Sequence, residues 1–149
     1  MSKSKRTNEK INLIGRYRVK RRSNRHIYKA EYNRMFPIKI SSSNFLSLYT
    51  LFLLNKHSEP LYGKEMLNKI QGISNSHVWN PSHGTYYPLL EKMEADGFIE
   101  KIKNDKSKNF YVITELGKNE LKVRLDEFKP ILTGGAKFFN NVLSDLYRK

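Results

Sequence analysis

The chain has 149 residues, with 28 Lys and Arg against 14 Asp and Glu, and therefore a formal net charge of +14. Its length fits one domain with appendages. It contains no Cys, which excludes disulfides, thiolate zinc sites and a cysteine nucleophile. A balance this basic predicts a polyanionic partner, with nucleic acid first and an anionic membrane surface second.

The hydrophobic pattern argues against a membrane protein. The most apolar stretch, residues 45–54, is half as long as the ~20 residues that a membrane span needs. No apolar segment of signal-peptide type follows the charged N-terminus. We therefore expect a cytoplasmic protein that makes no membrane contact.

The positive charge is concentrated at the N-terminus. Residues 1–40 contain 13 Lys or Arg and only two acidic residues, whereas residues 41–149 contain 15 basic and 12 acidic residues. Three serines at 41–43 separate the two parts. The sequence thus predicts a basic N-terminal arm over residues 1–43, with its densest cluster at Arg16, Arg18, Lys20, Arg21, Arg22 and Arg25.

Two interpretations of the arm stay open. Basic tails are a recurrent feature of nucleic-acid binders, and this arm can be a solvated tail of that kind. However, Tyr17 and Val19 alternate with basic residues, and Tyr28, Tyr32 and Met35 have helical spacing. In the second interpretation the arginines meet phosphates while the aromatic side chains pack on the domain.

Residues 44–70 predict two helices. The first, over residues 44–56 with Asn44 as N-cap, is apolar on nearly every side and must be buried on more than one face. We expect a second subunit to cover the extra face. The second helix covers residues 61–70 and points Met66, Leu67 and Ile70 inward.

A third helix begins after Ser82, whose hydroxyl can accept an amide hydrogen bond from the first turn. Its inward face is formed by Tyr86, Leu89, Leu90 and Met93. The dipeptide Asp96-Gly97 ends it. Small residues on the opposite face of its first half would allow close approach to another surface.

A β-hairpin and a further helix follow. Residues 98–103 and 110–113 predict two strands joined by a polar loop at 104–109. Thr114 caps a helix over residues 115–128, whose expected inward side chains are Leu116, Leu121, Leu125 and Phe128. Pro130 and the pair Gly134-Gly135 are expected to interrupt the chain before a last apolar stripe, formed by Phe138, Phe139, Val142, Leu143 and Leu146.

The order helix, helix, helix, hairpin, helix is that of a winged helix-turn-helix. The fold class is therefore mainly α with a small β-hairpin wing. We predict three parts: the basic arm at 1–43, a winged-helix DNA-binding domain at 44–128, and a C-terminal dimerisation helix at 129–149.

Residues 79–100 resemble the signature of the PadR family of bacterial transcriptional regulators. The matching features are Trp79, the pairs Pro81-Ser82, Gly84-Thr85 and Tyr87-Pro88, and the terminal Asp96-Gly97. The run at 111–117 is similar to the family's exit from the wing, and the resemblance covers roughly residues 44–128. In two departures, the wing tip carries an acid, Asp105, and Tyr86 replaces an aliphatic residue, which we expect only to enlarge the core.

The resemblance implies a dimeric winged-helix DNA binder, usually a repressor and often released by a small-molecule effector. By position it implies DNA contacts from Ser82, Thr85 and Tyr87 on the third helix and from Lys106 and Lys108 in the wing. The alternative for Tyr87 is packing on the second helix. The full set of candidate DNA-binding residues is Ser82, His83, Thr85, Tyr87, Lys92, Lys103, Lys106, Lys108 and the arm cluster Arg16, Arg18, Lys20, Arg21, Arg22 and Arg25.

Catalysis and metal binding have little support in the sequence. His77 and His83 have no partner at ligand spacing, and no nucleophile and base are paired, so we expect no enzyme, cofactor or metal. Trp79 is interpreted as a hydrophobic plug before the third helix, with effector stacking as the alternative. Two other functions stay open because fold does not decide function: a plasmid or phage DNA-maintenance protein, and an RNA-binding protein.

Overall fold

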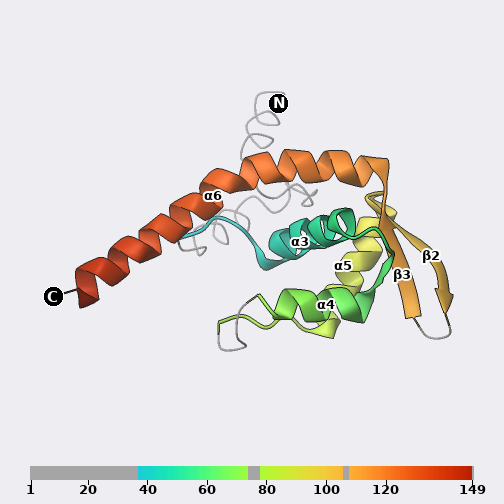
Figure 1. Ribbon diagram of the computed structural model, residues 1–149, viewed down its shortest axis with the longest axis horizontal. Coiled ribbons are helices and arrows are strands. Elements are labelled where there is room, and N and C mark those ends of the chain that lie inside the picture. Colours follow the sequence, from blue (N-terminus) through green and yellow to red (C-terminus); the bar gives the residue numbers. More distant parts are fainter. Residues whose placement is uncertain (1–36, 74–77, 106–107, 149) are drawn as a thin grey trace, which may run out of the picture. The chain divides into compact units, whose positions relative to one another are not determined.

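The computed structural model describes residues 37–73, 78–105 and 108–148. The described residues fall into two compact units, one formed by residues 45–124 and the other by residues 37–44 together with residues 125–148. The elements are α3 (Ser42–Lys56), β1 (Leu61–Tyr62), α4 (Gly63–Gln71), α5 (His83–Ala95), β2 (Ile99–Asp105), β3 (Lys108–Ile113) and α6 (Glu115–Tyr147) (Figure 1). This order confirms the predicted winged helix.

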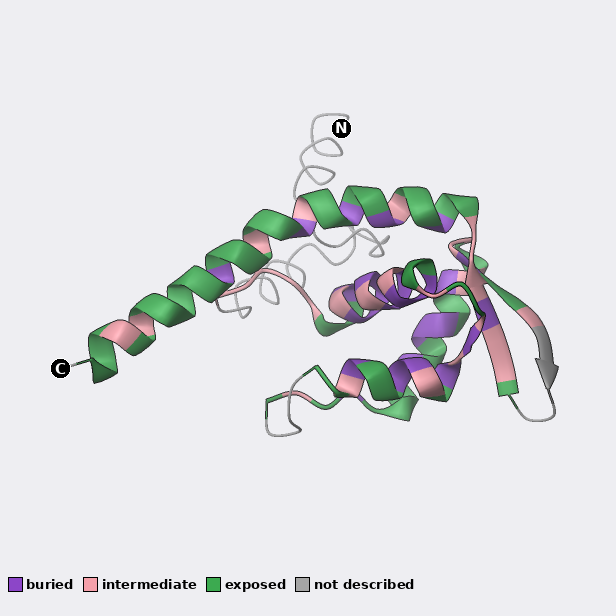
Figure 2. Cartoon of the chain, viewed as in Figure 1, coloured by how far each residue is buried: buried purple, intermediate pink, exposed green. Residues whose placement is uncertain are grey.

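The core of the winged-helix unit lies between three helices and the sheet. Figure 2 shows the buried faces of α3, α4 and α5 turned toward one another. The inward faces predicted for the second and third helices are confirmed, because all seven of their side chains are buried. The fully buried apolar residues of this unit are Leu46, Leu51, Met66, Leu67, Ile70, Tyr86, Leu90, Met93 and Ile99.

The sheet contains a strand that the sequence did not predict. Its order is β1-β3-β2, with both pairings antiparallel and Leu61 opposite Tyr111. The predicted second helix wrongly includes Leu61 and Tyr62, which form β1. A strand of two residues is too short to show alternation in the sequence. The predicted six-residue loop is also too long: β2 reaches Asp105 and β3 begins at Lys108, with irregular pairing between Ile102 and Asp105.

Helix α3 begins two residues earlier than predicted. Ser41, and not Asn44, caps it: the Ser41 hydroxyl accepts the amide of Asn44 at 3.2 Å. Asn44 itself is buried. The predicted burial of α3 on several faces is confirmed within a single chain. Its three aromatic residues, Phe45, Tyr49 and Phe52, are half-buried.

A hydrogen bond in the core links α3 to α5. The Thr50 hydroxyl donates to the Leu46 carbonyl at 2.8 Å and lies 2.7 Å from the Tyr86 hydroxyl, which therefore donates to it. Burial raises the pKa of Tyr86 far above its usual range and keeps this hydroxyl protonated. Tyr86 thus does more than enlarge the core, because its polar end requires a partner on α3.

We expect this pair to be coupled in stability. Thr50→Val strands a buried hydroxyl and should lower the free energy of unfolding by about 1–3 kcal/mol, whereas Tyr86→Phe removes only a donor and should cost about 1 kcal/mol. The double variant should lose less than the sum of the two. Urea unfolding at one fixed protein concentration measures all three, and additive losses would contradict the coupling.

The end of α5 and the start of α6, which flank the wing, are capped as predicted. Gly97 has a φ of 86°, and the amides of Gly97 and Phe98 donate to the carbonyls of Glu94 and Met93. Thr114 then caps α6, because its hydroxyl accepts the Gly117 amide at 3.0 Å. These bonds fix the two ends of the wing to the helices that flank it.

Helix α6 runs without interruption over 33 residues. The predicted breaks at Pro130 and Gly134-Gly135 are wrong, since a proline removes one helical hydrogen bond and glycine only lowers helix propensity. Two predicted inward residues are exposed instead, Leu116 at 53% and Leu125 at 47%. The buried face carries Arg124, which pairs with Glu120 at 2.8 Å and donates to the Ser47 hydroxyl.

Candidate nucleic-acid interface

The first two turns of α5 present a polar, exposed face. Ser82, His83, Thr85 and Tyr87 are all exposed on it. Ser82 has the extended backbone of an N-cap, but its hydroxyl makes no cap hydrogen bond and donates to the Thr85 hydroxyl at 3.3 Å. The predicted capping position is therefore confirmed and the predicted capping bond is wrong.

Tyr87 packs on α4 and also keeps an exposed surface. A Cβ atom added at Gly63 would lie 2.7 Å from Cε1 of Tyr87, so only glycine lets the ring lie this close to the start of α4. The Tyr87 side of α5 is nevertheless open, with this residue 39% exposed and its hydroxyl 3.3 Å from Nδ1 of His83. Packing on the second helix thus orients the ring and leaves it accessible.

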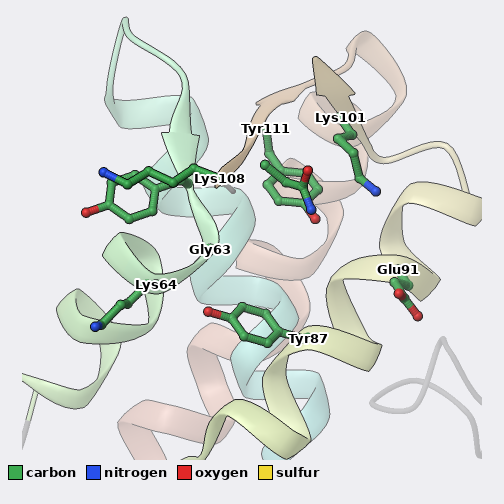
Figure 3. A pocket seen from close by; sticks show the side chains of 9 residues that line it. Gly63, Lys64, Tyr87, Glu91, Lys101, Lys108 and Tyr111 are labelled. Atoms are coloured by element: carbon green, nitrogen blue, oxygen red, sulfur yellow. The ribbon is translucent and has the colours of Figure 1, made fainter. Parts of the chain in front are cut away.

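A cavity of about 490 Å³ lies between α5, the start of α4 and the wing. Figure 3 shows Lys64 and Lys108 on one side of it, Lys101 and Glu91 on the other, and Tyr87 and Tyr111 between them. Its lining residues are Tyr62, Gly63, Lys64, Tyr87, Glu91, Lys101, Lys108, Asn109 and Tyr111. Three lysines against one glutamate make the lining positive.

Aromatic rings and carboxylates orient the lysines of the wing. Nζ of Lys108 lies 4.5 Å from the centre of the Tyr62 ring, a cation–π distance. Nζ of Lys101 is 4.0 Å from a Glu94 carboxylate oxygen. Burial, followed by the nearby Glu94 and Glu91 carboxylates, raises the pKa of Tyr111, which lines this cavity.

The structure brings together some of the predicted residues. Tyr87 and Lys108 line one cavity although they come from different elements. Lys92 lies apart in the last turn of α5, where it pairs with Asp96 at 3.4 Å. Lys106 and the six basic residues of the arm cluster lie outside the described residues, as does the side chain of Lys103.

Sequence reasoning missed most of the cavity lining. Tyr62, Gly63, Lys64, Glu91, Lys101, Asn109 and Tyr111 were not among the candidate residues. A signal for Gly63 and Lys64 was present, because a glycine followed by a lysine stands at the start of the second helix. The wing residues carry no such signal, since alternation alone does not show which strand face meets α5.

The remaining single residues have structural explanations. Trp79 is half-buried, and its ring meets that of Phe45 edge-on at 5.4 Å, which favours the plug interpretation. His83 is exposed, and His77 lies outside the described residues. Within residues 37–73, 78–105 and 108–148, no group of three or more His, Cys, Asp or Glu is arranged to hold a metal ion. No helix in these ranges is long and apolar enough to cross a membrane.

Comparison with known proteins agrees with this geometry. Residues 51–123 match the profile of the Transcriptional regulator PadR-like family. The chain resembles a PadR family transcription regulator from Clostridium difficile, with a TM-score of 0.52 and 21% identity over 64% of this chain and 98% of that one. It also resembles a transcriptional regulator from Clostridium thermocellum, with a TM-score of 0.50 and 20% identity over 73% of this chain and 99% of that one.

At these identities the solved structures show the fold alone. The comparison with curated proteins gave no match. The family therefore comes from the profile match, which covers the end of α3, the whole of α4 and α5, the cavity, the wing and the start of α6. The winged-helix domain of this chain belongs to the PadR-like family of transcriptional regulators.

Proposed function

We propose that this protein is a repressor that binds an inverted-repeat DNA operator as a homodimer. The observation that supports this most is the exposed polar face of α5 beside the lysine-lined cavity. In winged helix-turn-helix proteins the third helix enters a major groove and the wing follows the backbone. A two-fold dimer would place two such helices about one helical turn apart.

The residues divide by chemistry. Thr85 and Tyr87 are suited to base edges, because a hydroxyl, a methyl group and a ring face can meet donors, acceptors and thymine methyls in the major groove. Lys64, Lys101 and Lys108 are suited to phosphates, which position a protein without specifying sequence. The first amides of α4 add a partial positive charge at the same place.

The arm would add further phosphate contacts through its cluster of six basic residues at 16–25. Its charge and its position before the domain support this role. A small-molecule effector, which the family resemblance implies, stays a prediction. So does action as a repressor, which depends on where the operator lies relative to a promoter.

The proposed dimer would use the last part of α6. Phe138, Phe139, Leu143 and Leu146 are exposed there within a single chain, and Val142 is half-buried. Figure 2 shows how little of this part of the helix is buried. Exposed apolar stripes of this kind mark protein contacts, and a two-fold axis lets one stripe cover its own copy.

Genome-wide recovery of bound DNA, followed by titration on the recovered site, tests this function. We expect an inverted repeat near promoters. Thr85→Ala and Tyr87→Ala should each weaken specific binding by about 1–3 kcal/mol, which is the usual energy of one good interaction with a base edge. Asn119→Ala, on an exposed position of α6 outside the cavity, is the matched control. If both α5 variants bind the operator as tightly as the parent protein, another element reads the DNA.

A further inference from the structure

A glycine in the middle of α6 receives a side chain from the end of the arm. Gly135 is buried, and a Cβ atom added there would lie 2.7 Å from both Cδ1 and Cγ1 of Ile38. Its neighbour Gly134 has nothing within 4 Å of such an atom. Of these two adjacent helical glycines, therefore, one forms a notch that a neighbour fills and the other does not.

The surrounding residues support the same contact. Residues 37–40, which form the root of the arm, are half-buried. They fall in one compact unit with the C-terminal part of α6, separate from the winged-helix unit of residues 45–124. The end of the arm is thus associated with the C-terminal helix, although in sequence it is joined directly to α3.

We propose that the arm root docks on the C-terminal helix of its own chain through Ile38 and Gly135, so that this helix, and not the winged-helix domain, carries the basic arm. The docking itself is independent of DNA. Its consequence, that the helix sets where the arm can meet phosphates, rests on the proposed function.

The docking also defines one end of the proposed dimer surface. Gly135 shares a face of α6 with Ile131 and Val142, because separations of four and seven residues return to the same side of a helix. The arm root covers this face at Gly135, whereas the exposed Phe139 and Leu146 follow one and three turns later. A second subunit would then meet α6 beyond the root, and a shift of that helix would move the arm with it.

Engineered disulfides test the docking, since the chain contains no Cys of its own. Ile38→Cys combined with Gly135→Cys should close an intrachain disulfide, because Cγ1 of Ile38, which is bonded to its Cβ, lies 2.7 Å from a Cβ added at Gly135. This places the two Cβ atoms near the separation of about 3.5–4.5 Å that a disulfide needs. Ile38→Cys combined with Gly134→Cys is the matched control and should oxidise at least about tenfold more slowly, since it lacks this proximity. Peptide mapping and gel mobility with and without reductant distinguish the products.

Two results would overturn the proposal. Equal oxidation of the pair and its control would mean that Ile38 has no preferred place on the helix. A covalent dimer from the Gly135 pair would mean that the root docks on a partner's helix. Because neither readout uses DNA, failure here is separate from failure of operator binding, which the α5 variants test.

A second measurement avoids Cys altogether. Gly135→Leu should fill the notch and displace Ile38, so trypsin should cut after the half-buried Lys39 faster than in the parent protein. Gly134→Leu changes the same helix at a position with open space and should leave this cleavage rate near that of the parent. Equal acceleration by both variants would contradict docking at Gly135.

Discussion

Phe139→Asp combined with Leu143→Asp is expected to convert the protein to a monomer and to abolish tight operator binding. These side chains are 46% and 56% exposed in one chain, so the change should cost the monomer little stability. In the proposed dimer the same positions face the partner, where four unpaired carboxylates would be buried at high cost. The loss of the second half-site should lower affinity by about 10²–10⁴-fold.

Light scattering at micromolar concentration and DNA titration measure the two effects. Asn140→Asp combined with Asn141→Asp is the matched control, because it adds the same charge at exposed positions off the stripe. It should stay dimeric and bind DNA almost like the parent. Circular dichroism checks that each variant keeps its helices. A parent that is monomeric, or a stripe variant that stays dimeric, would contradict the dimer.

The elements with strong local signals were predictable from the sequence. Helix α5 carries an apolar stripe of helical period, a residue of N-cap type before it and a glycine after it, and its inward residues were all predicted correctly. The hairpin that follows has turn residues between two apolar runs. Both features depend on neighbours within a few residues, which is the range over which periodicity and capping act.

Features that depend on distant partners were not predictable in this way. Strand β1 exists because β3 offers it a pairing edge 50 residues later. The cavity combines Tyr62 and Lys64 with Tyr87 and Lys108, and nothing local to any of them indicates the other elements. Tertiary contacts, which lie far apart in the sequence, decide such cases.

Two residues of α6 show how residue type misleads. Arg124 is charged and was not expected in the buried face, yet it lies there with its Nε paired to Glu120 and its Nη1 donating to Ser47. Gly135 was expected to interrupt a helix, but it lies within α6 and faces the side chain of Ile38. In both cases the role of the residue depends on the side chains that contact it, which residue type alone does not reveal.

Removal of residues 1–25 is expected to reduce both the affinity for DNA and its dependence on salt, while leaving sequence preference nearly intact. This deletion removes the cluster of six basic residues at 16–25 and leaves Ile38 and the arm root in place. Each phosphate contact contributes about −0.9 to the slope of log K against log salt concentration. Losing three contacts per subunit in a dimer would therefore make this slope shallower by about five units. The fall in affinity between 50 and 200 mM salt would then be about 10³-fold smaller than in the parent protein.

Titrations of parent and truncated protein on operator and random DNA, over one salt series, measure this effect. A full-length variant with Gln at the six basic positions is the matched control, because it removes the charge of the cluster and keeps the chain length. It should reproduce the shallow slope of the truncated protein. Equal slopes for all three proteins would mean that the arm does not touch phosphates. A loss of preference for the operator would instead mean that the arm reads bases, since phosphate contacts carry no sequence information.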